Sequence, residues 1–437
     1  MLLGFKVKNF KSFKDLQYFS MLASKVRLNE NHITEIGKYK ILNFSEIFGA
    51  NGSGKSNLIL AMSMLKTIVN NGIGSLINNL YYRGSKSGKL DNSYFEYEIT
   101  LNDKFYSYGF ELNIFKREIV SEWLIDMSKT TQKVIYERDI VNEEFKTDIK
   151  KPNIYFVNCL NELKSNKNEL FIKEMLRRLV LSNNEDPFFD EIISVFKYLM
   201  YDMIIIRPSS HKLLDFDYLK NSEKVLNILK ALDINIVNIT TAPFDMESIE
   251  RKLNKDDFLI LKNEVDTLSL RNKNSYTLRI NNDLFSIKKN NDGGYEVNSL
   301  KFIHKNSKET FGAYDESDGT IRIIELMDIL ITENKLYLID ELESSLHPKL
   351  VIGLLKLFLN SKNNNQLIIT THEAIALNFN LVRRDEIWFT EKNDEGASRL
   401  YSLEEFKDVA RFDKKIDKAY MEGRFGAIAK IDIDYEN

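Results

Sequence analysis

The alternation of hydrophobic and polar residues has a period of two near the start of the chain. Residues 2–10 alternate as a strand does, and a second short strand is predicted over 16–22. Four later segments repeat this period and predict an antiparallel meander: 95–101, 105–114, 119–127 and 133–137. Asn102-Asp103 is the turn expected between the first two of them.

Elsewhere the apolar residues recur at helical spacing or in short unbroken runs. Helical spacing predicts helices over 57–69, 162–203, 218–232, 246–268, 317–331 and 348–360. Strands are predicted over 41–48, 203–206, 276–288, 295–304, 336–339, 366–370 and 386–390. The last block alternates strands with helices, which is the rhythm of an α/β fold.

Composition narrows the class of protein. The 437 residues are 43% apolar and 29% charged, which suits a globular chain of two or three domains. The net charge of −3 argues against a general nucleic-acid coat protein, although a local basic patch stays possible. The one cysteine, Cys159, excludes an intramolecular disulfide and is expected to be a small core residue. No signal pattern or apolar stretch of ~20 residues is present, so a cytoplasmic protein without membrane contact is expected.

The strongest motif is a glycine-rich loop that follows the strand predicted over 41–48. It matches the phosphate-loop pattern G-x-x-x-x-G-K-S/T and reads Gly49-Ala50-Asn51-Gly52-Ser53-Gly54-Lys55-Ser56. Its glycines let backbone N–H groups turn toward phosphates, and the next helix adds its positive end. Lys55 is then expected to reach the β- and γ-phosphates of a nucleotide and Ser56 to ligate Mg²⁺. A chance glycine-rich turn is the alternative, and the flanking strand and helix disfavour it.

A second motif delivers two carboxylates at the end of the buried strand predicted over 336–339. Asp340 is expected to hold Mg²⁺ directly or through water, and Glu341 to polarise an attacking water. An apolar run followed by Asp-Glu is common by chance, so this motif is weak alone and becomes strong evidence only together with the phosphate loop.

Two further segments carry polar residues that fit the same site. Ser317, Asp318 and Gly319 stand at the start of the helix predicted to run to Ile331, and they are either a plain N-cap or a loop that clasps the γ-phosphate held by another subunit. His372 follows the strand predicted over 366–370, where it is either a surface residue or core donor, or a contact to the γ-phosphate or the attacking water. The segment 343–348 between the two buried strands fits a loop that crosses a dimer interface.

These motifs together resemble those of ABC-type AAA ATPases grouped with the OLD, RecF and SMC heads. The resemblance rests on Asn9-Phe10-Lys11-Ser12-Phe13, the phosphate loop, Ser317 to Thr320, Asp340 to Pro348 and Thr370-Thr371-His372. The C-terminal segment 419–427 is similar to the ending of standalone abortive-infection and phage-defence ATPases, including the AbiL-like, RloA-like and PARIS ATPase proteins.

The resemblance implies a fold and a set of ATP contacts. The fold is an α/β ABC-ATPase head, with a mixed α/β core and an antiparallel β subdomain, split by a largely helical insert and without a long coiled coil. Its parts are an N-terminal lobe over 1–140, an insert over 141–305 and a C-terminal lobe over 306–437. Catalysis is assigned to Glu341, His372 and Lys55, and Mg²⁺ to Ser56 and Asp340. ATP contacts are assigned to Gly49, Asn51, Gly52, Ser53, Gly54, Lys55, Ser56 and Asn57, and in trans to Ser317 and Gly319.

The resemblance also implies partners. A homodimer or higher homo-oligomer through the heads is expected, with a separately encoded effector such as a Toprim or HNH nuclease and a phage trigger protein. The chain is then an ATPase that acts as the sensor of an anti-phage system. The main alternative is a RecF-like DNA-repair ATPase. DNA contact is open because the basic pairs Arg177-Arg178, Lys288-Lys289 and Arg383-Arg384 are read as solvated faces without interleaved aromatic residues.

Departures from the family pattern limit the other readings. No glutamine is assigned to a Q-loop. Asp318-Gly319-Thr320 stands where transporters carry Gly-Gly-Gln, which disfavours a transporter subunit. Only about sixty residues follow His372, too few for a nuclease domain of ordinary size.

Overall fold

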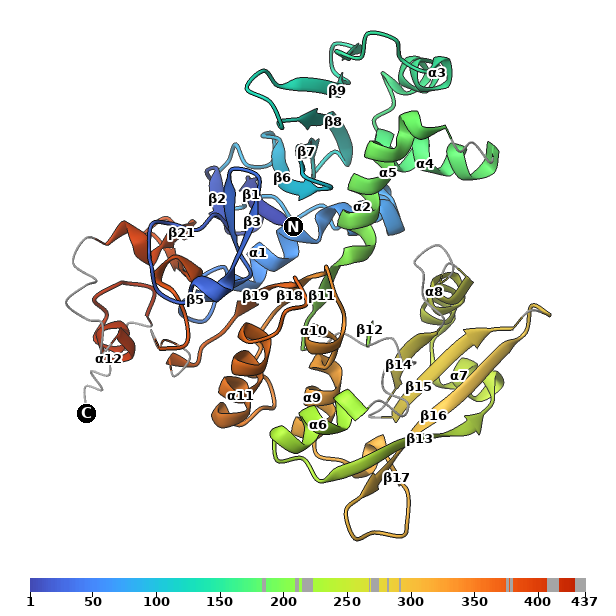
Figure 1. Ribbon diagram of the computed structural model, residues 1–437. Coiled ribbons are helices and arrows are strands. Elements are labelled where there is room, and N and C mark those ends of the chain that lie inside the picture. Colours follow the sequence, from blue (N-terminus) through green and yellow to red (C-terminus); the bar gives the residue numbers. More distant parts are fainter. Residues whose placement is uncertain are drawn as a thin grey trace, which may run out of the picture. The chain divides into compact units, whose positions relative to one another are not determined.

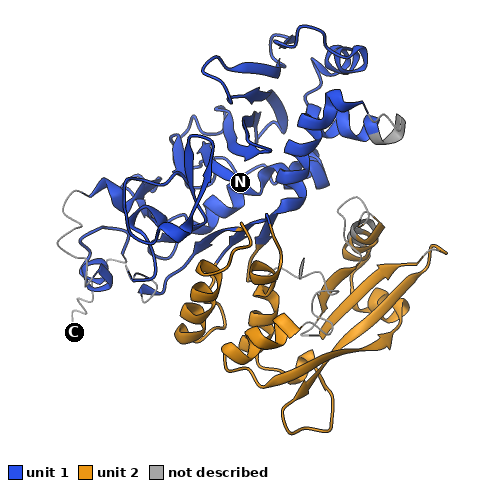
Figure 2. Cartoon of the chain, in the orientation of Figure 1, with its two compact units in different colours: residues 1–205, 334–340, 366–437 blue, residues 206–333, 341–365 orange. Residues whose placement is uncertain are grey.

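The computed structural model forms two compact units. Unit 1 comprises residues 1–205, 334–340 and 366–437, and unit 2 comprises 206–333 and 341–365 (Figure 2). The structure describes residues 1–182, 186–208, 212–213, 223–266, 268, 275–280, 283–290, 292–374, 377, 380–406 and 416–428. The three-part division expected from the sequence remains a prediction, and its insert, 141–305, falls in both units.

A six-stranded sheet forms the centre of unit 1, in the order β11-β18-β19-β5-β20-β21 (Figure 1). The strands are β11 (Met203–Ile206), β18 (Leu336–Ile339), β19 (Gln366–Thr370), β5 (Phe44–Phe48), β20 (Ile387–Lys392) and β21 (Ser398–Ser402). The run from β18 to β20 is parallel, and β21 pairs antiparallel with β20. Every residue of β18, β19 and β5 is buried, as expected for strands covered on both faces.

Two predictions near the phosphate loop are wrong in detail. The strand expected over 41–48 is two strands, because β4 (Tyr39–Leu42) pairs with β3 (Ile33–Ile36) in another sheet before β5 begins. The helix expected over 57–69 is also two elements, α1 (Lys55–Met62) and α2 (Met64–Asn71). They meet at Ser63, whose hydroxyl donates to the Leu60 carbonyl at 2.7 Å and so competes with regular helical bonding.

The second sheet of unit 1 is antiparallel, in the order β10-β9-β8-β7-β6-β1-β2. Its strands are β10 (Glu144–Lys146), β9 (Lys133–Asp139), β8 (Glu118–Asp126), β7 (Lys104–Asn113), β6 (Ser93–Leu101), β1 (Leu2–Lys8) and β2 (Gln17–Ser20). The meander predicted from the period of two is confirmed.

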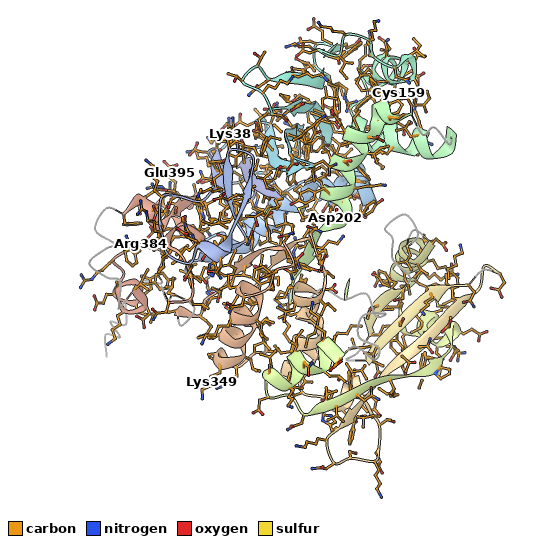
Figure 3. The ribbon with its side chains drawn as sticks, viewed as in Figure 1. Lys38, Cys159, Asp202, Lys349, Arg384 and Glu395 are labelled. Carbon is orange, nitrogen blue, oxygen red and sulfur yellow. The ribbon has the colours of Figure 1, made fainter. Side chains whose placement is uncertain are left out.

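Three helices follow this sheet in unit 1: α3 (Ile154–Leu163), α4 (Phe171–Ser182) and α5 (Asp190–Lys197). Cys159 lies buried on α3, as expected (Figure 3). The fully buried carboxylate of Glu122, on β8, accepts from the first two N–H groups of α4 at 2.5 and 3.1 Å. It also accepts from the buried guanidinium of Arg138 at 3.0 Å, so one carboxylate joins two strands to a helix N-terminus.

Unit 2 contains a third large sheet and six α-helices among its described residues. The sheet order is β12-β14-β15-β16-β13, with β17 (Phe311–Gly312) paired to β16. The strands are β12 (Lys212–Leu213), β14 (Tyr276–Ile280), β15 (Asp283–Lys289), β16 (Tyr295–His304) and β13 (Ile236–Phe244). The helices are α6 (Glu223–Ala231), α7 (Met246–Lys252), α8 (Lys255–Asp266), α9 (Asp318–Leu326), α10 (Asp328–Ile331) and α11 (Pro348–Leu359).

The described helices are short. The longest, α4, α8 and α11, have 12 residues each, so the expected absence of a long coiled coil holds for the described part of the chain. Within that part, none of the helices has the length and apolarity needed to cross a membrane.

The basic pairs of the sequence are not three equivalent solvated faces. Arg383 is fully buried and bonds to Asp385 and to the carbonyl of Val26, so its assignment to a solvated face is wrong. Arg177 and Arg178 both donate to Glu174, at 2.6–2.8 Å. These two pairs are engaged in intramolecular contacts, which weakens the case for DNA binding there.

A buried carboxyl group lies in the middle of the parallel sheet. Glu46, on β5, is flanked by Ile369 on β19 and Ile387 on β20. Among the described residues neither of its oxygens has a hydrogen-bond partner. Burial raises the pKa of Glu46 well above its usual range, and the nearby charge of Glu386 raises it further. The folded protein therefore favours the protonated form of this side chain.

The raised pKa predicts a pH effect on stability. Because folded Glu46 keeps a proton that the unfolded chain has lost, its contribution to the free energy of unfolding falls as pH rises above about 4.3, the ordinary Glu pKa. Glu46→Met should remove this fall and stabilise the protein by about 1–3 kcal/mol at pH 8. Urea denaturation between pH 6 and 9 measures both, with Glu404→Gln at an exposed position as the control. An unchanged pH slope in Glu46→Met would contradict the assignment.

Candidate functional site

The glycine-rich loop lies between β5 and α1, the strand–loop–helix context that a phosphate loop needs. β5 ends at Phe48 and α1 begins at Lys55. Gly52 has a φ of 74° and Gly54 a φ of 123°, a region in which residues with a side chain are strained. Backbone N–H groups of such a loop and the N-terminus of α1 offer donors to an anion.

The β20–β21 hairpin holds this loop in place. Thr390 on β20 shares a hydrogen bond of 2.6 Å with the hydroxyl of Ser53, and Ser398 on β21 donates to the Ser53 carbonyl. A Cβ atom at Gly49 would come within 2.5 Å of the Thr390 carbonyl oxygen, so the loop passes too close for a side chain. Thr390 and Ser398 are site residues that sequence reasoning missed, since they lie more than 330 positions beyond the loop.

A residue of the Asn9–Phe13 motif contacts the same region. The amide of Asn57 on α1 donates to the hydroxyl of Ser12 at 2.8 Å. The Ser398 N–H donates to the Ser12 carbonyl at 2.7 Å. The motif near the N-terminus therefore braces the start of α1 against the hairpin.

Lys55 and His372, predicted separately, lie together. The Lys55 ammonium donates to the carbonyls of Gly49 at 2.6 Å and Ala50 at 3.2 Å, and lies 3.3 Å from Nδ1 of His372. Because an ammonium group can only donate, Nδ1 of His372 is the acceptor in this contact. The imidazole therefore stands directly over the lysine of the phosphate loop.

Asp340 joins the ends of three segments. Its Oδ1 accepts from the hydroxyl of Ser56 at 3.0 Å and from that of Thr370 at 2.6 Å. Asp340 follows β18, Ser56 lies in the first turn of α1, and Thr370 ends β19. The motif analysis assigned no role to Thr370, although it lies within Thr370-Thr371-His372.

The side-chain oxygens around Asp340 are of the kind that Mg²⁺ prefers. In proteins Mg²⁺ takes one or two protein oxygens and completes its octahedron with water and phosphate oxygens. The Ser56 hydroxyl and the Asp340 carboxylate are two such oxygens, and their role as Mg²⁺ ligands stays a prediction. Within the described residues, no group of three or more His, Cys, Asp or Glu side chains could hold a metal ion.

Ser317 and Gly319 lie in unit 2, at the start of α9. The Ser317 hydroxyl accepts from the Thr320 N–H at 3.1 Å, so it is an N-cap, and the side chain is also exposed. A Cβ at Gly319 would come within 3.0 Å of the Ser345 carbonyl oxygen, which places the start of α9 against the 343–348 segment. An N-cap role for Ser317 is therefore compatible with a contact to a γ-phosphate bound by another subunit.

Glu341 lies two residues after the end of β18 and is the first residue of the second segment of unit 2. Its φ of 52° is left-handed, which is uncommon for a residue other than glycine. Its carbonyl oxygen accepts from the Ser344 N–H at 3.0 Å, which closes a turn after the strand.

The C-terminal segment packs against the sheet behind the phosphate loop. The Tyr401 hydroxyl donates to the Phe425 carbonyl at 2.7 Å, and the ring of Tyr420 stacks on Phe389 of β20 with centroids 5.7 Å apart. Tyr420 also packs on Phe48, the residue before Gly49, at 5.7 Å. The 419–427 motif therefore supports both strands that hold the loop.

Comparison with known families places the chain. A family model described as AAA domain, putative AbiEii toxin, Type IV TA system matches residues 45–378. The chain belongs to this family. The match spans every site residue from the phosphate loop to His372, so the AAA domain includes residues of both units. No curated protein matches the chain.

The solved structures that are similar to this AAA protein include three SMC heads. The SMC head bound to the C-winged helix domain of ScpA is 16% identical, with 92% of this chain and 99% of that chain covered and a TM-score of 0.43. The SMC head domain from Thermotoga maritima is 12% identical, with 92% and 98% covered and a TM-score of 0.39. The Smc head with an extended coiled coil, bound to the C-terminal domain of ScpA and derived from Pyrococcus furiosus, is 15% identical, with 95% and 99% covered and a TM-score of 0.44.

The Thr370 contact predicts a metal effect. Thr370→Val keeps the side-chain shape but removes the donor to Asp340, so the carboxylate should turn away from Ser56. We expect an approximately 10- to 100-fold rise in the Mg²⁺ concentration that half-saturates nucleotide-dependent turnover. A Mg²⁺ titration at fixed ATP measures this, with Thr332→Val as the control, because it also removes a threonine hydroxyl, one that donates to the Asp328 carbonyl in unit 2. An unchanged Mg²⁺ requirement would show that Thr370 does not orient Asp340.

Proposed function

We propose that this chain is an Mg²⁺-dependent ATPase whose ATP site is completed by a second copy of the chain. The observation that carries the proposal is the convergence of Ser56, Asp340 and Thr370 beneath the loop, with His372 against Lys55. A phosphate loop, a metal-binding corner and an imidazole are the groups that phosphoryl transfer to water needs. Membership of an AAA-domain family supports ATP as the nucleotide.

In this proposal each residue has a separate task. The loop from Gly49 to Asn57 binds the phosphates, and Lys55 leaves its loop carbonyls to neutralise the β- and γ-oxygens. Ser56 and Asp340 hold Mg²⁺, which supplies further charge neutralisation at the phosphates. Glu341 orients and polarises the attacking water, and His372 donates to the γ-phosphate or to that water.

The second copy is proposed from the exposed start of α9. Ser317 offers a hydroxyl and Gly319 a backbone N–H at a helix N-terminus, which together favour an anion. We assign them to the γ-phosphate bound by another molecule. A homodimer or higher homo-oligomer follows, with two composite sites in the dimer.

The biological role we propose is that of a sensor or regulatory subunit in a bacterial anti-phage system. The description of the family names an AbiEii toxin and a toxin–antitoxin system, which supports abortive infection as the setting. ATP binding would hold the assembly, and a phage trigger would change it and release or activate a separately encoded effector, such as a Toprim or HNH nuclease. A RecF-like repair role would instead need a DNA surface, and two of the three basic pairs are engaged within the chain.

The composite site predicts complementation between two inactive variants. Lys55→Ala should abolish ATP binding at its own loop, and Ser317→Arg should block hydrolysis at the partner's loop while its own loop still binds ATP. A mixed dimer contains one intact site, formed by Lys55 of one chain and Ser317 of the other. Mixing the two inactive proteins should therefore restore up to about a quarter of wild-type ATPase activity, because half of the dimers are mixed and each has one site of two.

The control for this experiment is Lys55→Ala mixed with a Lys55→Ala,Ser317→Arg double variant, which leaves no intact site. Full activity of Ser317→Arg alone, or no recovery in mixtures that are shown to contain mixed dimers, would contradict a site shared between molecules.

Glu341 predicts a trapped assembly. Glu341→Gln keeps the shape of the side chain but removes the charge that polarises water, so turnover should fall at least about 100-fold while ATP still binds. Sizing in the presence of ATP and Mg²⁺ should then show a dimer or larger species that wild type forms only transiently. Wild-type turnover in Glu341→Gln would exclude Glu341 as the base.

A further inference from the structure

The backbone of Glu341 is held in a costly conformation. A left-handed φ at a residue with a side chain costs on the order of 1–3 kcal/mol and persists only where neighbouring contacts enforce it. Two donors converge on its carbonyl oxygen: the Ser344 N–H at 3.0 Å and the Arg322 guanidinium at 3.4 Å. The first contact belongs to the turn itself, while the second comes from α9.

Arg322 is itself fixed by burial and charge. Its side chain is only 6% exposed, and its Nη1 donates to Glu325, one turn further along α9, at 3.3 Å. Its Nε has no hydrogen-bond partner among the described residues. A buried guanidinium with so few acceptors depends on the Glu325 carboxylate and the Glu341 carbonyl for its position.

Glu325 connects this arginine to the sheet of unit 2. Its carboxylate is 5% exposed, and its other oxygen accepts from Arg279 on β14 at 2.7 Å. One carboxylate therefore lies between two guanidinium groups, one from the sheet and one from the helix. All four residues belong to unit 2 (Figure 2).

We propose that Arg322, held by Glu325 and Arg279, is a positioning residue for Glu341. Arg322 touches the Glu341 backbone and not its carboxylate, so its effect is on where the side chain starts and points. Through Glu325 the same contact makes the orientation of the water-polarising carboxylate depend on strand β14. This inference rests on the proposed role of Glu341 in ATP hydrolysis.

The chain from β14 to Glu341 also indicates where turnover can be controlled. A molecule that binds the sheet and displaces Arg279 would change hydrolysis without any contact to the phosphate loop. Such control acts on the chemical step, since the phosphate loop, Ser56 and Asp340 lie in unit 1.

The experiment separates positioning from binding. In the full-length protein, Arg322→Gln, Glu325→Gln and Arg279→Gln should each lower kcat by about 10- to 100-fold, the scale of a 1 Å misplacement, while ATP affinity stays within about twofold of wild type. The Arg279→Gln,Glu325→Gln double variant should lose little more than the worse single variant, because both changes break one chain of contacts. Arg322→Lys should recover part of the rate, because an ammonium keeps the charge without the fork.

The matched control is Lys289→Gln. Lys289 on β15 pairs with Asp266 of α8 at 2.7 Å, so it also joins the same sheet to a helix but does not reach Glu341. This variant should keep wild-type kcat and affinity. Arg279 is 23% exposed, so Arg279→Gln tests the proposal even where a change at the buried Arg322 prevents folding.

Two results would overturn the inference. One is wild-type kcat in folded Arg279→Gln and Glu325→Gln, and the other is a parallel loss of kcat and ATP affinity. The failure is distinguishable from failure of the proposed function, because Glu341→Gln reports on the latter alone. An inactive Glu341→Gln beside an active Arg322→Gln removes only the positioning role.

Discussion

The carboxylate of Asp340 is the contact on which the candidate site depends. It accepts hydrogen bonds from Ser56, in the helix after β5, and from Thr370, the last residue of β19. The carboxyl ends of parallel strands meet at one edge, so residues nearly 300 positions apart in the chain come within hydrogen-bonding distance. A buried carboxylate needs such donors. The hydroxyls that satisfy this carboxylate therefore lie at the same corner that we propose holds Mg²⁺.

The loop above this corner is positioned by the chain's last described strands. Thr390 and Ser398 bond to Ser53, and the aromatic side chains of the C-terminal segment pack behind β5 and β20. A loop rich in glycine has no side chains with which to fix itself, so its order must come from neighbours. This explains why a motif near the end of the sequence accompanies a phosphate loop near its start.

The parts of this structure that follow from local patterns were predictable, and those that follow from distant contacts were not. β18 and β19 have the predicted bounds, because an unbroken apolar run between polar residues leaves few other choices. The breaks at Asn43 and Ser63 were missed, since the apolar pattern continues across both and only pairing or a side-chain hydroxyl reveals them. Arg383 was misread because a charged pair gives no sign of the Asp385 and carbonyl partners that allow its burial.

The same division explains the site. Lys55, Ser56 and Asp340 carry their chemistry in short motifs, whereas Thr390 and Arg322 act through contacts that no spacing encodes. The contact of Arg322 also distinguishes the two acidic residues that follow β18. Asp340 belongs to unit 1 and holds the corner beneath the loop, while Glu341 belongs to unit 2 and is bonded to the helix that begins with Ser317. A single peptide bond thus joins the residue assigned to the metal to the residue assigned to water. A change in the packing of α9 can therefore act on Glu341 through the Arg322 contact to its carbonyl.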